Sequence, residues 1–200
     1  MNEFTSVSLL QQIKDHTNID AWQRFTSLYE KWIRRYLAGR GVRSHDADDV
    51  VQEVLAFISR EIVGFDHNGR LGAFRNWLRQ VTANRLKEFC RKQKQVVSDG
   101  PDLEALADEL IDEDSGLSRI WQREHDRFVV EQLLEHISDR FRKKSILAFR
   151  KIILEGKQAQ DVANELNLSV GAVRVAQSRV LRMLQTVGEG LIDDSLPCGD

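Results

Sequence analysis

The stretch QAQDVANELNLSVGAVRVAQSRVLRML, residues 158–184, carries the sharpest local pattern in the chain. Its apolar spacing predicts a short helix over 158–165 and a longer helix over 170–184. Between the two, Asn167 is suited to a left-handed turn and Ser169 to the N-cap of the second helix. Two helices joined by so short a turn are the layout of a helix-turn-helix, a module that places its second helix in the DNA major groove.

The second of these helices is predicted to have two different faces. Valines and leucines at helical spacing form the side that would face a core. The opposite side mixes small residues with cations: Ala172, Arg174, Val175, Ser178, Arg179 and Arg182. Small side chains let a helix approach DNA closely, and arginine binds guanine or phosphate. An ordinary helical core with a solvated basic face is the alternative interpretation.

Composition sets the class of protein around this motif. The chain has 200 residues, 42% hydrophobic and 30% charged, with a net charge of −2, as expected for one or two globular domains. Its longest apolar run is five residues, far short of a membrane span, and its start lacks a signal-peptide pattern, so we expect a cytoplasmic location. Two cysteines form no disulfide or metal-binding spacing, and only two prolines are present, which favours an all-α fold.

Charge divides the chain into blocks. Residues 70–94 contain eight Lys or Arg against one Glu, and residues 140–182 contain ten against three acids. Between them, residues 99–114 hold eight acids and neither Lys nor Arg. We therefore expect two small helical domains joined by a flexible acidic linker, in which leucines from Leu103 to Leu110 are spaced for a short amphipathic helix. Basic modules attract phosphate backbones, although solvated helix faces would have the same composition.

Three helices are predicted before the linker. An aromatic stripe from Trp22 to Tyr36 indicates a core-facing helix that ends near Gly39. A second helix begins near Ser44, its expected N-cap, and carries acids in its first turns, where the helix dipole favours them. A third runs from about Gly72 to Lys94. Its Trp77 falls on the apolar stripe, and we interpret it as a core residue.

Five short sequence motifs resemble conserved segments of a known protein family. Residues 46–54 (DADDVVQEV), 72–78 (GAFRNWL) and 81–85 (VTANR) are similar to the second conserved region of extracytoplasmic-function (ECF) sigma factors of the sigma-70 family. Residues 154–156 (LEG) and 168–174 (LSVGAVR) are similar to their fourth conserved region. The resemblance covers about residues 15–95 and 125–188. Their order and spacing match that family along most of the chain.

The resemblance implies a domain plan and a function. Residues 1–95 would be the region 2 domain, 96–124 the linker, 125–190 the region 4 helix-turn-helix domain and 191–200 a disordered tail. Such proteins are not enzymes and carry no cofactor. They bring core RNA polymerase to promoters through its clamp helices and flap. Many are held by an anti-sigma factor, and nothing in this sequence identifies such a partner or any insertion into a membrane.

The resemblance also implies three sets of site residues, which agree with the chemistry of the side chains. Acidic and amide groups would bind polymerase: Asp46, Asp48, Asp49, Gln52 and Glu53. Cations and one amide would bind the melted minus-ten element: Arg75, Arg79, Asn84, Arg85, Lys87, Arg91 and Lys92. The recognition helix would bind the minus-thirty-five element through Ser169, Gly171, Arg174, Ser178, Arg179 and Arg182.

Departures and alternatives remain at this point. Val175, Ala176 and Gln177 stand where the family commonly has Ser, Arg and an apolar residue, so the promoter sequence is not readable. A helix-turn-helix regulator that acts without polymerase would explain the C-terminal part alone. A metal-dependent enzyme is a more distant alternative, based on His45, Asp49 and Glu53 at four-residue steps. The linker would either thread the polymerase cleft or serve as a soluble tether.

Overall fold

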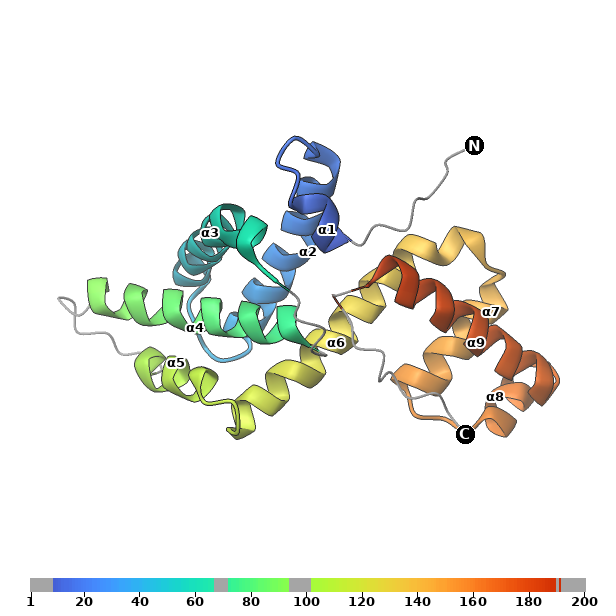
Figure 1. Ribbon diagram of the computed structural model, residues 1–200. Helices are drawn as coiled ribbons and strands as arrows, with labels where there is room; N and C mark the ends of the chain where they lie inside the picture. Colours follow the sequence, from blue (N-terminus) through green and yellow to red (C-terminus); the bar gives the residue numbers. More distant parts are fainter. Residues whose placement is uncertain (1–8, 67–71, 94–101, 190, 192–200) are drawn as a thin grey trace. The chain divides into compact units, whose positions relative to one another are not determined.

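The computed structural model describes residues 9–66, 72–93, 102–189 and 191. Its elements are helical, as the sequence predicts, and Figure 1 shows their order along the chain. The α-helices are α1 (Leu9–Ile13), α2 (Ile19–Ala38), α3 (Ser44–Glu61), α4 (Ala73–Gln93), α5 (Leu103–Ile111), α6 (Gly116–Ile137), α7 (Lys143–Phe149), α8 (Ala159–Leu166) and α9 (Val170–Val187). Three short helices are η1 (Ile62–Gly64), η2 (Ser138–Arg140) and the π-helical η3 (Arg150–Leu154).

These helices form two compact units. Residues Gln11–His125 make the first, here called the N-terminal unit, and the second is built mainly from Asp126 onwards and is called the C-terminal unit. Helix α6 contributes residues to both. The predicted tail, 191–200, lies outside the described residues except for Leu191, which is buried.

Helix α2 supplies the aromatic core of the N-terminal unit. Asn18 caps it by accepting a hydrogen bond from the backbone N–H of Ala21 at 3.1 Å, and the helix ends at Gly39, as the sequence predicts. Its aromatic stripe is buried, and the ring of Trp32 lies 5.3 Å from that of Trp121 on α6, edge to face. Aromatic pairs at this geometry stabilise a core beyond their buried area. The first half of α6 therefore packs on α2.

Helices α3 and α4 complete that core. The predicted capping role of Ser44 is wrong, because Ser44 is the first residue of α3 and Arg43, the N-cap, makes no capping hydrogen bond through its side chain. Val50, Val54 and Ile58 are buried. Along α4, Trp77 is half-buried with its ring 4.9 Å from that of Phe65, consistent with a packing role. The predicted end of α4 at Lys94 lies outside the described residues.

Part of the acidic stretch is folded. Helix α5 begins after Asp102, whose carboxylate accepts hydrogen bonds from the N–H groups of Glu104 and Ala105, and it packs along α4. Ala107 and Leu110 are buried, as the amphipathic spacing predicts. Helix α5 (Leu103–Ile111) thus has an apolar face, and Asp108 and Glu109 are exposed on its outside. The prediction of a flexible linker was based on charge, and charge does not show that the apolar face of α5 packs against α4.

The C-terminal unit is built around a small aliphatic core. Its members come from α7, α8 and α9: Ala148, Val162, Ala163, Val173 and Ala176. Two lysines connect α8 to the segment before it: the Nζ atoms of Lys151, in η3, and of Lys157, in the following turn, each lie 2.6 Å from the Glu165 carboxylate. These bonds lower the pKa of Glu165 to about 2, with Lys151 as the largest cause. Hydrogen bonding to Glu165 raises the pKa of Lys157 in return.

The turn between α8 and α9 follows the chemistry of its residues. Asn167 adopts a left-handed conformation with φ 53° and ψ 59°, which ends α8. The backbone N–H of Leu168 then donates to the carbonyl of Ala163 at 2.9 Å. The Ser169 hydroxyl accepts a hydrogen bond from the Ala172 N–H at 3.1 Å and so caps α9.

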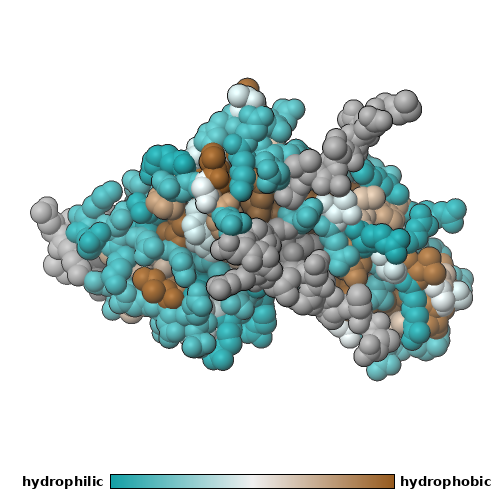
Figure 2. Space-filling view, viewed as in Figure 1, coloured by the Kyte–Doolittle hydropathy of each residue, from teal (hydrophilic) through white to brown (hydrophobic). Residues whose placement is uncertain are grey.

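Hydrophilic side chains cover most of the surface drawn in Figure 2, with small hydrophobic patches between them. Within the described ranges, no helix combines the length and the apolar character that crossing a membrane requires.

Candidate functional site

The acidic residues of α3 divide into an outward-facing set and an internal set. Asp49, Gln52 and Glu53 are exposed along one side of the helix. Asp46 is buried, with its carboxylate 3.1 Å from the His45 ring, and Asp48 pairs with an arginine of α2. Three of the five predicted polymerase-binding residues are therefore available to a partner, while Asp46 and Asp48 are engaged within the unit.

The Asp48 contact ties α3 to α2. Its carboxylate lies 2.6 Å from Arg34 Nε, and Arg34 also pairs with Glu30 on its own helix at 3.0 Å. These hydrogen bonds raise the pKa of Arg34, with Asp48 as the largest cause. Asp48 thus orients the start of α3 against α2 and helps to hold the exposed carboxylates in place.

A groove runs between α3 and α4 and joins two of the predicted sites. Asp49 and Glu53 line it from α3, and Arg85 and Lys92 line it from α4. Lys92 Nζ lies 3.7 Å from the Glu53 carboxylate across the groove. Sequence reasoning missed Arg60, which also lines it; the signal was available, because Arg60 follows Glu53 by seven residues and so shares its helix face.

The metal-site alternative finds no support in this geometry. His45 turns to the Asp46 carboxylate, and Glu53 faces Lys92. Nowhere in the described part of the chain do three His, Cys, Asp or Glu side chains gather as metal ligands would.

The predicted DNA-binding residues of α4 differ in exposure and in the contacts that they make within the protein. Asn84, Arg91 and Lys92 are exposed. The Arg85 guanidinium is partly buried, 2.7 Å from Glu88 and 4.8 Å from the centre of the Phe57 ring, a cation–π contact. On another side of α4, Lys87 lies 2.6 Å from Asp108 of α5.

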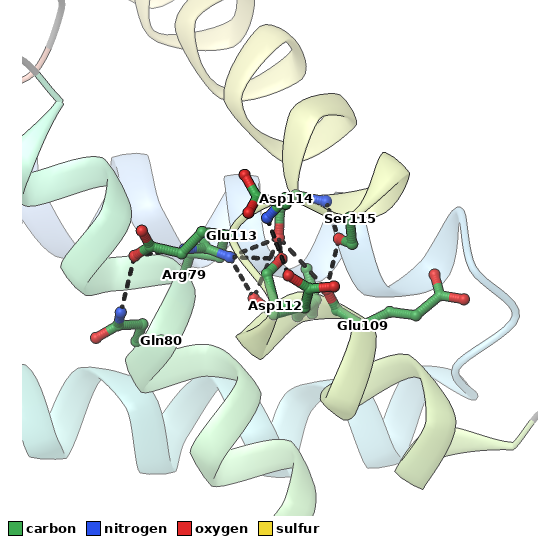
Figure 3. Close-up of polar contacts among 9 residues, drawn as sticks. Arg79, Gln80, Glu109, Asp112, Glu113, Asp114 and Ser115 are labelled. Atoms are coloured by element: carbon green, nitrogen blue, oxygen red, sulfur yellow. Dashed lines mark hydrogen bonds and ion pairs between the residues drawn. The ribbon is translucent and has the colours of Figure 1, made fainter.

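Arg79 departs most from its sequence prediction. Its side chain is fully buried and donates hydrogen bonds to the Leu110 carbonyl and the Ser118 hydroxyl. It also donates to the carbonyl of Asp112, which Figure 3 shows beside it. Glu113 adds an ion pair at 3.2 Å. Burial lowers the pKa of Arg79, and the charges of Glu113 and Asp112 oppose that shift.

Arg75 is also buried, with 8% of its surface exposed. The side chains of Arg75 and Arg79 are thus both buried, whereas the sequence prediction placed them on a DNA-binding surface. Arg79 instead holds the end of α5 and the start of α6 against α4. A sequence shows that a residue is basic but not that a distant acidic segment folds over it.

The outer face of α9 carries the third predicted set. All six residues are exposed: Ser169, Gly171, Arg174, Ser178, Arg179 and Arg182. Among the described residues, no carboxylate pairs with the three arginines of this face. The set forms one basic surface, which we call the α9 face. Its charge and the small residues near the start of α9 suit close approach to a nucleic acid.

A second groove in the C-terminal unit lies beside this face. Ile152, Ile153 and Val170 line it, together with Arg174. It brings apolar surface to the junction of η3, α8 and α9.

Comparisons with known proteins agree with the motifs. The family model for sigma-70 region 2 matches residues 25–96, which include α3, α4 and their groove. The ECF RNA polymerase sigma factor SigE of Mycolicibacterium smegmatis is 22% identical over 197 residues, an alignment that covers 97% of this chain and 70% of the relative. No solved structure matches the chain. Residues 25–96 therefore match sigma-70 region 2, and the chain is similar over most of its length to a sigma factor of the extracytoplasmic-function type.

Proposed function

We propose that this protein is an alternative sigma factor that binds core RNA polymerase and directs promoter-specific initiation of transcription. The observation that carries the proposal is the pair of exposed, oppositely charged surfaces on separate units of a chain that matches sigma-70 region 2. The carboxylates of α3 suit a protein partner with a basic surface, and the arginines of the α9 face suit DNA.

The polymerase contact is assigned to the N-terminal unit. Asp49, Gln52 and Glu53 are exposed side by side on α3, so they can meet the polymerase clamp helices together. Charged groups at the rim of such an interface mainly speed association and select the partner. In the C-terminal unit, the groove lined by Ile152 and Val170 offers apolar surface for the flap.

The minus-ten contact is assigned to α4 with a smaller set than the sequence predicts: Asn84, Arg85, Lys87, Arg91 and Lys92. Single-stranded DNA is held by cations that follow its backbone and by groups that bind unstacked bases. Arg85, Lys87 and Lys92 are paired with carboxylates in the free protein, so DNA must replace those ion pairs. The pairs of Lys87 and Lys92 are exposed and therefore weak, so their exchange costs little, whereas Arg85 is partly buried and would have to leave both Glu88 and the Phe57 ring.

The minus-thirty-five contact is assigned to α8 and α9 acting as a helix-turn-helix. Arg174, Arg179 and Arg182 project from α9 and can bind guanine edges or phosphates in the major groove. Ser169 and Gly171 lie at the helix N-terminus, where backbone N–H groups and the helix dipole favour a phosphate. Together these contacts would fix the register of the unit on the duplex.

The proposal is tested by separating the two contacts. Charge reversal by Asp49→Lys with Glu53→Lys should weaken polymerase binding while circular dichroism stays unchanged, because both side chains are exposed. Glu61→Lys with Glu109→Lys gives the same change in net charge at other exposed positions and should not weaken it. Binding is measured with fluorescently labelled protein and purified core enzyme.

Arg179→Ala should leave polymerase binding intact and weaken upstream promoter binding by about 1–3 kcal/mol, the usual value for a bidentate base contact. Arg127→Ala, at an exposed arginine of α6, is the matched control. If both the charge reversal and Arg179→Ala left transcription unchanged, the residue assignments would be wrong. DNA binding without any polymerase binding would favour the regulator that acts alone.

A further inference from the structure

An apolar side chain occupies the middle of the α9 face. Val175 is 58% exposed and belongs to a small group of large hydrophobic side chains that the described residues leave in solvent. It stands one helical turn after Gly171 and one turn before Arg179, and it directly follows Arg174. Single exposed valines are common, but this one lies among cations on a face that otherwise has no large apolar group.

Helix geometry places Val175 opposite the core. Successive residues of an α-helix point about 100° apart. The direction of Val175 therefore differs by about 160° from that of Val173, which is fully buried. It differs by about 40° or less from the directions of Gly171, Arg179 and Arg182. Packing within the C-terminal unit therefore does not account for an apolar residue at this position. The neighbours that share its direction are the predicted DNA contacts.

The chemistry of the side chain limits what it can bind. A valine isopropyl group neither donates nor accepts a hydrogen bond, so it cannot bind a phosphate or a polar base edge. In the major groove the apolar group of a base pair is the C5 methyl of thymine. Val is stiff at χ1, so little rotamer freedom is lost when it is held against such a group. Gly171 and Ala172, both exposed, allow the helix to approach closely enough.

We infer that Val175 is a specificity-determining residue that contacts a thymine methyl group in the minus-thirty-five element. The inference rests on the proposed function and makes it more specific. It assigns an A·T pair to the centre of the site read by α9, next to the positions contacted by the flanking arginines. Loss of one methyl contact corresponds to about a fourfold loss of affinity, from the transfer free energy of one buried carbon group.

The test uses the holoenzyme assembled from core polymerase and the full chain. Start sites that depend on the protein first define its promoter. Promoter duplexes are then made in which each thymine of the upstream element is replaced in turn by deoxyuridine, which lacks only the methyl group, and their equilibrium binding is measured. The affinity of the wild-type holoenzyme should fall about fourfold when deoxyuridine replaces the thymine at one position. Val175→Ala should bind the unmodified promoter more weakly and lose its response to that one replacement.

Leu147→Ala, at a half-exposed residue of α7, serves as the control and should keep the wild-type response. The inference is overturned if no deoxyuridine replacement weakens binding, or if Val175→Ala keeps the full response. It is also overturned if Val175→Ala weakens core binding instead, which would place Val175 against polymerase. In those cases initiation still depends on the protein, so the proposed function stands. Absence of any protein-dependent start site would overturn both.

Discussion

At the scale of single residues, Arg79 shows how context changes the meaning of a charge. Its guanidinium lies inside the N-terminal unit. Burying an unpaired charge there would lower the free energy of unfolding by roughly several kcal/mol. The carbonyl of Leu110, the Ser118 hydroxyl and the Glu113 carboxylate supply the partners that make burial tolerable. The acidic stretch therefore has a structural role in this unit in addition to any part it plays in a complex.

Removal of that guanidinium should destabilise the N-terminal unit strongly. Arg79→Ala removes the guanidinium that donates to the Leu110 carbonyl and the Ser118 hydroxyl, and we expect a loss of about 3 kcal/mol in the free energy of unfolding. Urea unfolding followed by tryptophan fluorescence is a suitable measurement, because all four tryptophans lie between residues 22 and 121.

Lys87→Ala is the matched control on the same pair of helices. Its ion pair with Asp108 is exposed, so its loss should cost less than about 1 kcal/mol. Equal, small effects of the two substitutions would contradict the role given to Arg79.

The Val175 inference belongs to the same scale. Exposed Val175 and buried Arg79 are two of the places where the described residues depart from a simple division into polar outside and apolar inside. One departure is explained by contacts within the protein, and the other calls for a partner outside it.

At the scale of elements, the sequence predicted the features that depend on residues close together in the chain, namely helices, caps and turns. Local chemistry predicts helices over 158–165 and 170–184, a left-handed Asn167 and a Ser169 cap. The structure has α8 at Ala159–Leu166 and α9 at Val170–Val187, with Asn167 left-handed and Ser169 as the N-cap. Amphipathic spacing likewise predicted α5. What the pattern could not show was which helix the apolar side of α5 covers, because that contact joins residues about 30 apart, such as Arg79 and Leu110. For the same reason, the burial of Arg79, a predicted DNA contact, could not be read from the local pattern.

The Asn167 turn gives a prediction for α8 and α9. Asn167→Gly should change stability by less than about 1 kcal/mol, because glycine also adopts a left-handed conformation. Asn167→Val should cost about 1–2 kcal/mol, because a β-branched side chain is disfavoured there. Thermal unfolding of the C-terminal unit, followed through the methyl NMR signals of its core valines, distinguishes the two. A valine variant as stable as the glycine variant would show that the turn does not hold the conformation described.

The Glu165 contacts predict a response to acid. The pKa of this carboxyl is about 2 in the folded chain and about 4.5 in the unfolded chain, so its stabilising effect is fully present above pH 4.5 and is lost as the pH falls towards 2. Glu165→Gln should therefore lower the melting temperature of the C-terminal unit near neutral pH. The difference from wild type should disappear as the pH approaches 2. A difference that stays constant over this range would mean that the carboxylate is not paired as described.

At the scale of the whole molecule, a net charge near zero conceals a strongly divided chain. The exposed carboxylates of α3 and two cations of α4 share one groove of the N-terminal unit, and the arginines of the α9 face belong to the C-terminal unit. The acidic stretch pairs with further cations of α4 within the protein. This distribution fits a factor that must bind one large protein assembly and two stretches of DNA at once. Composition alone would not reveal it, since the charges cancel in the sum.

The central claim, that this chain is a promoter-specific initiation factor, is tested most directly by transcription from defined DNA. Purified core RNA polymerase is supplied with genomic DNA fragments from the same organism, with and without the full-length protein, and transcript start sites are mapped. We expect discrete new start sites that require the protein and that share two upstream sequence elements. The absence of such sites, together with no binding of the chain to core polymerase, would contradict the claim.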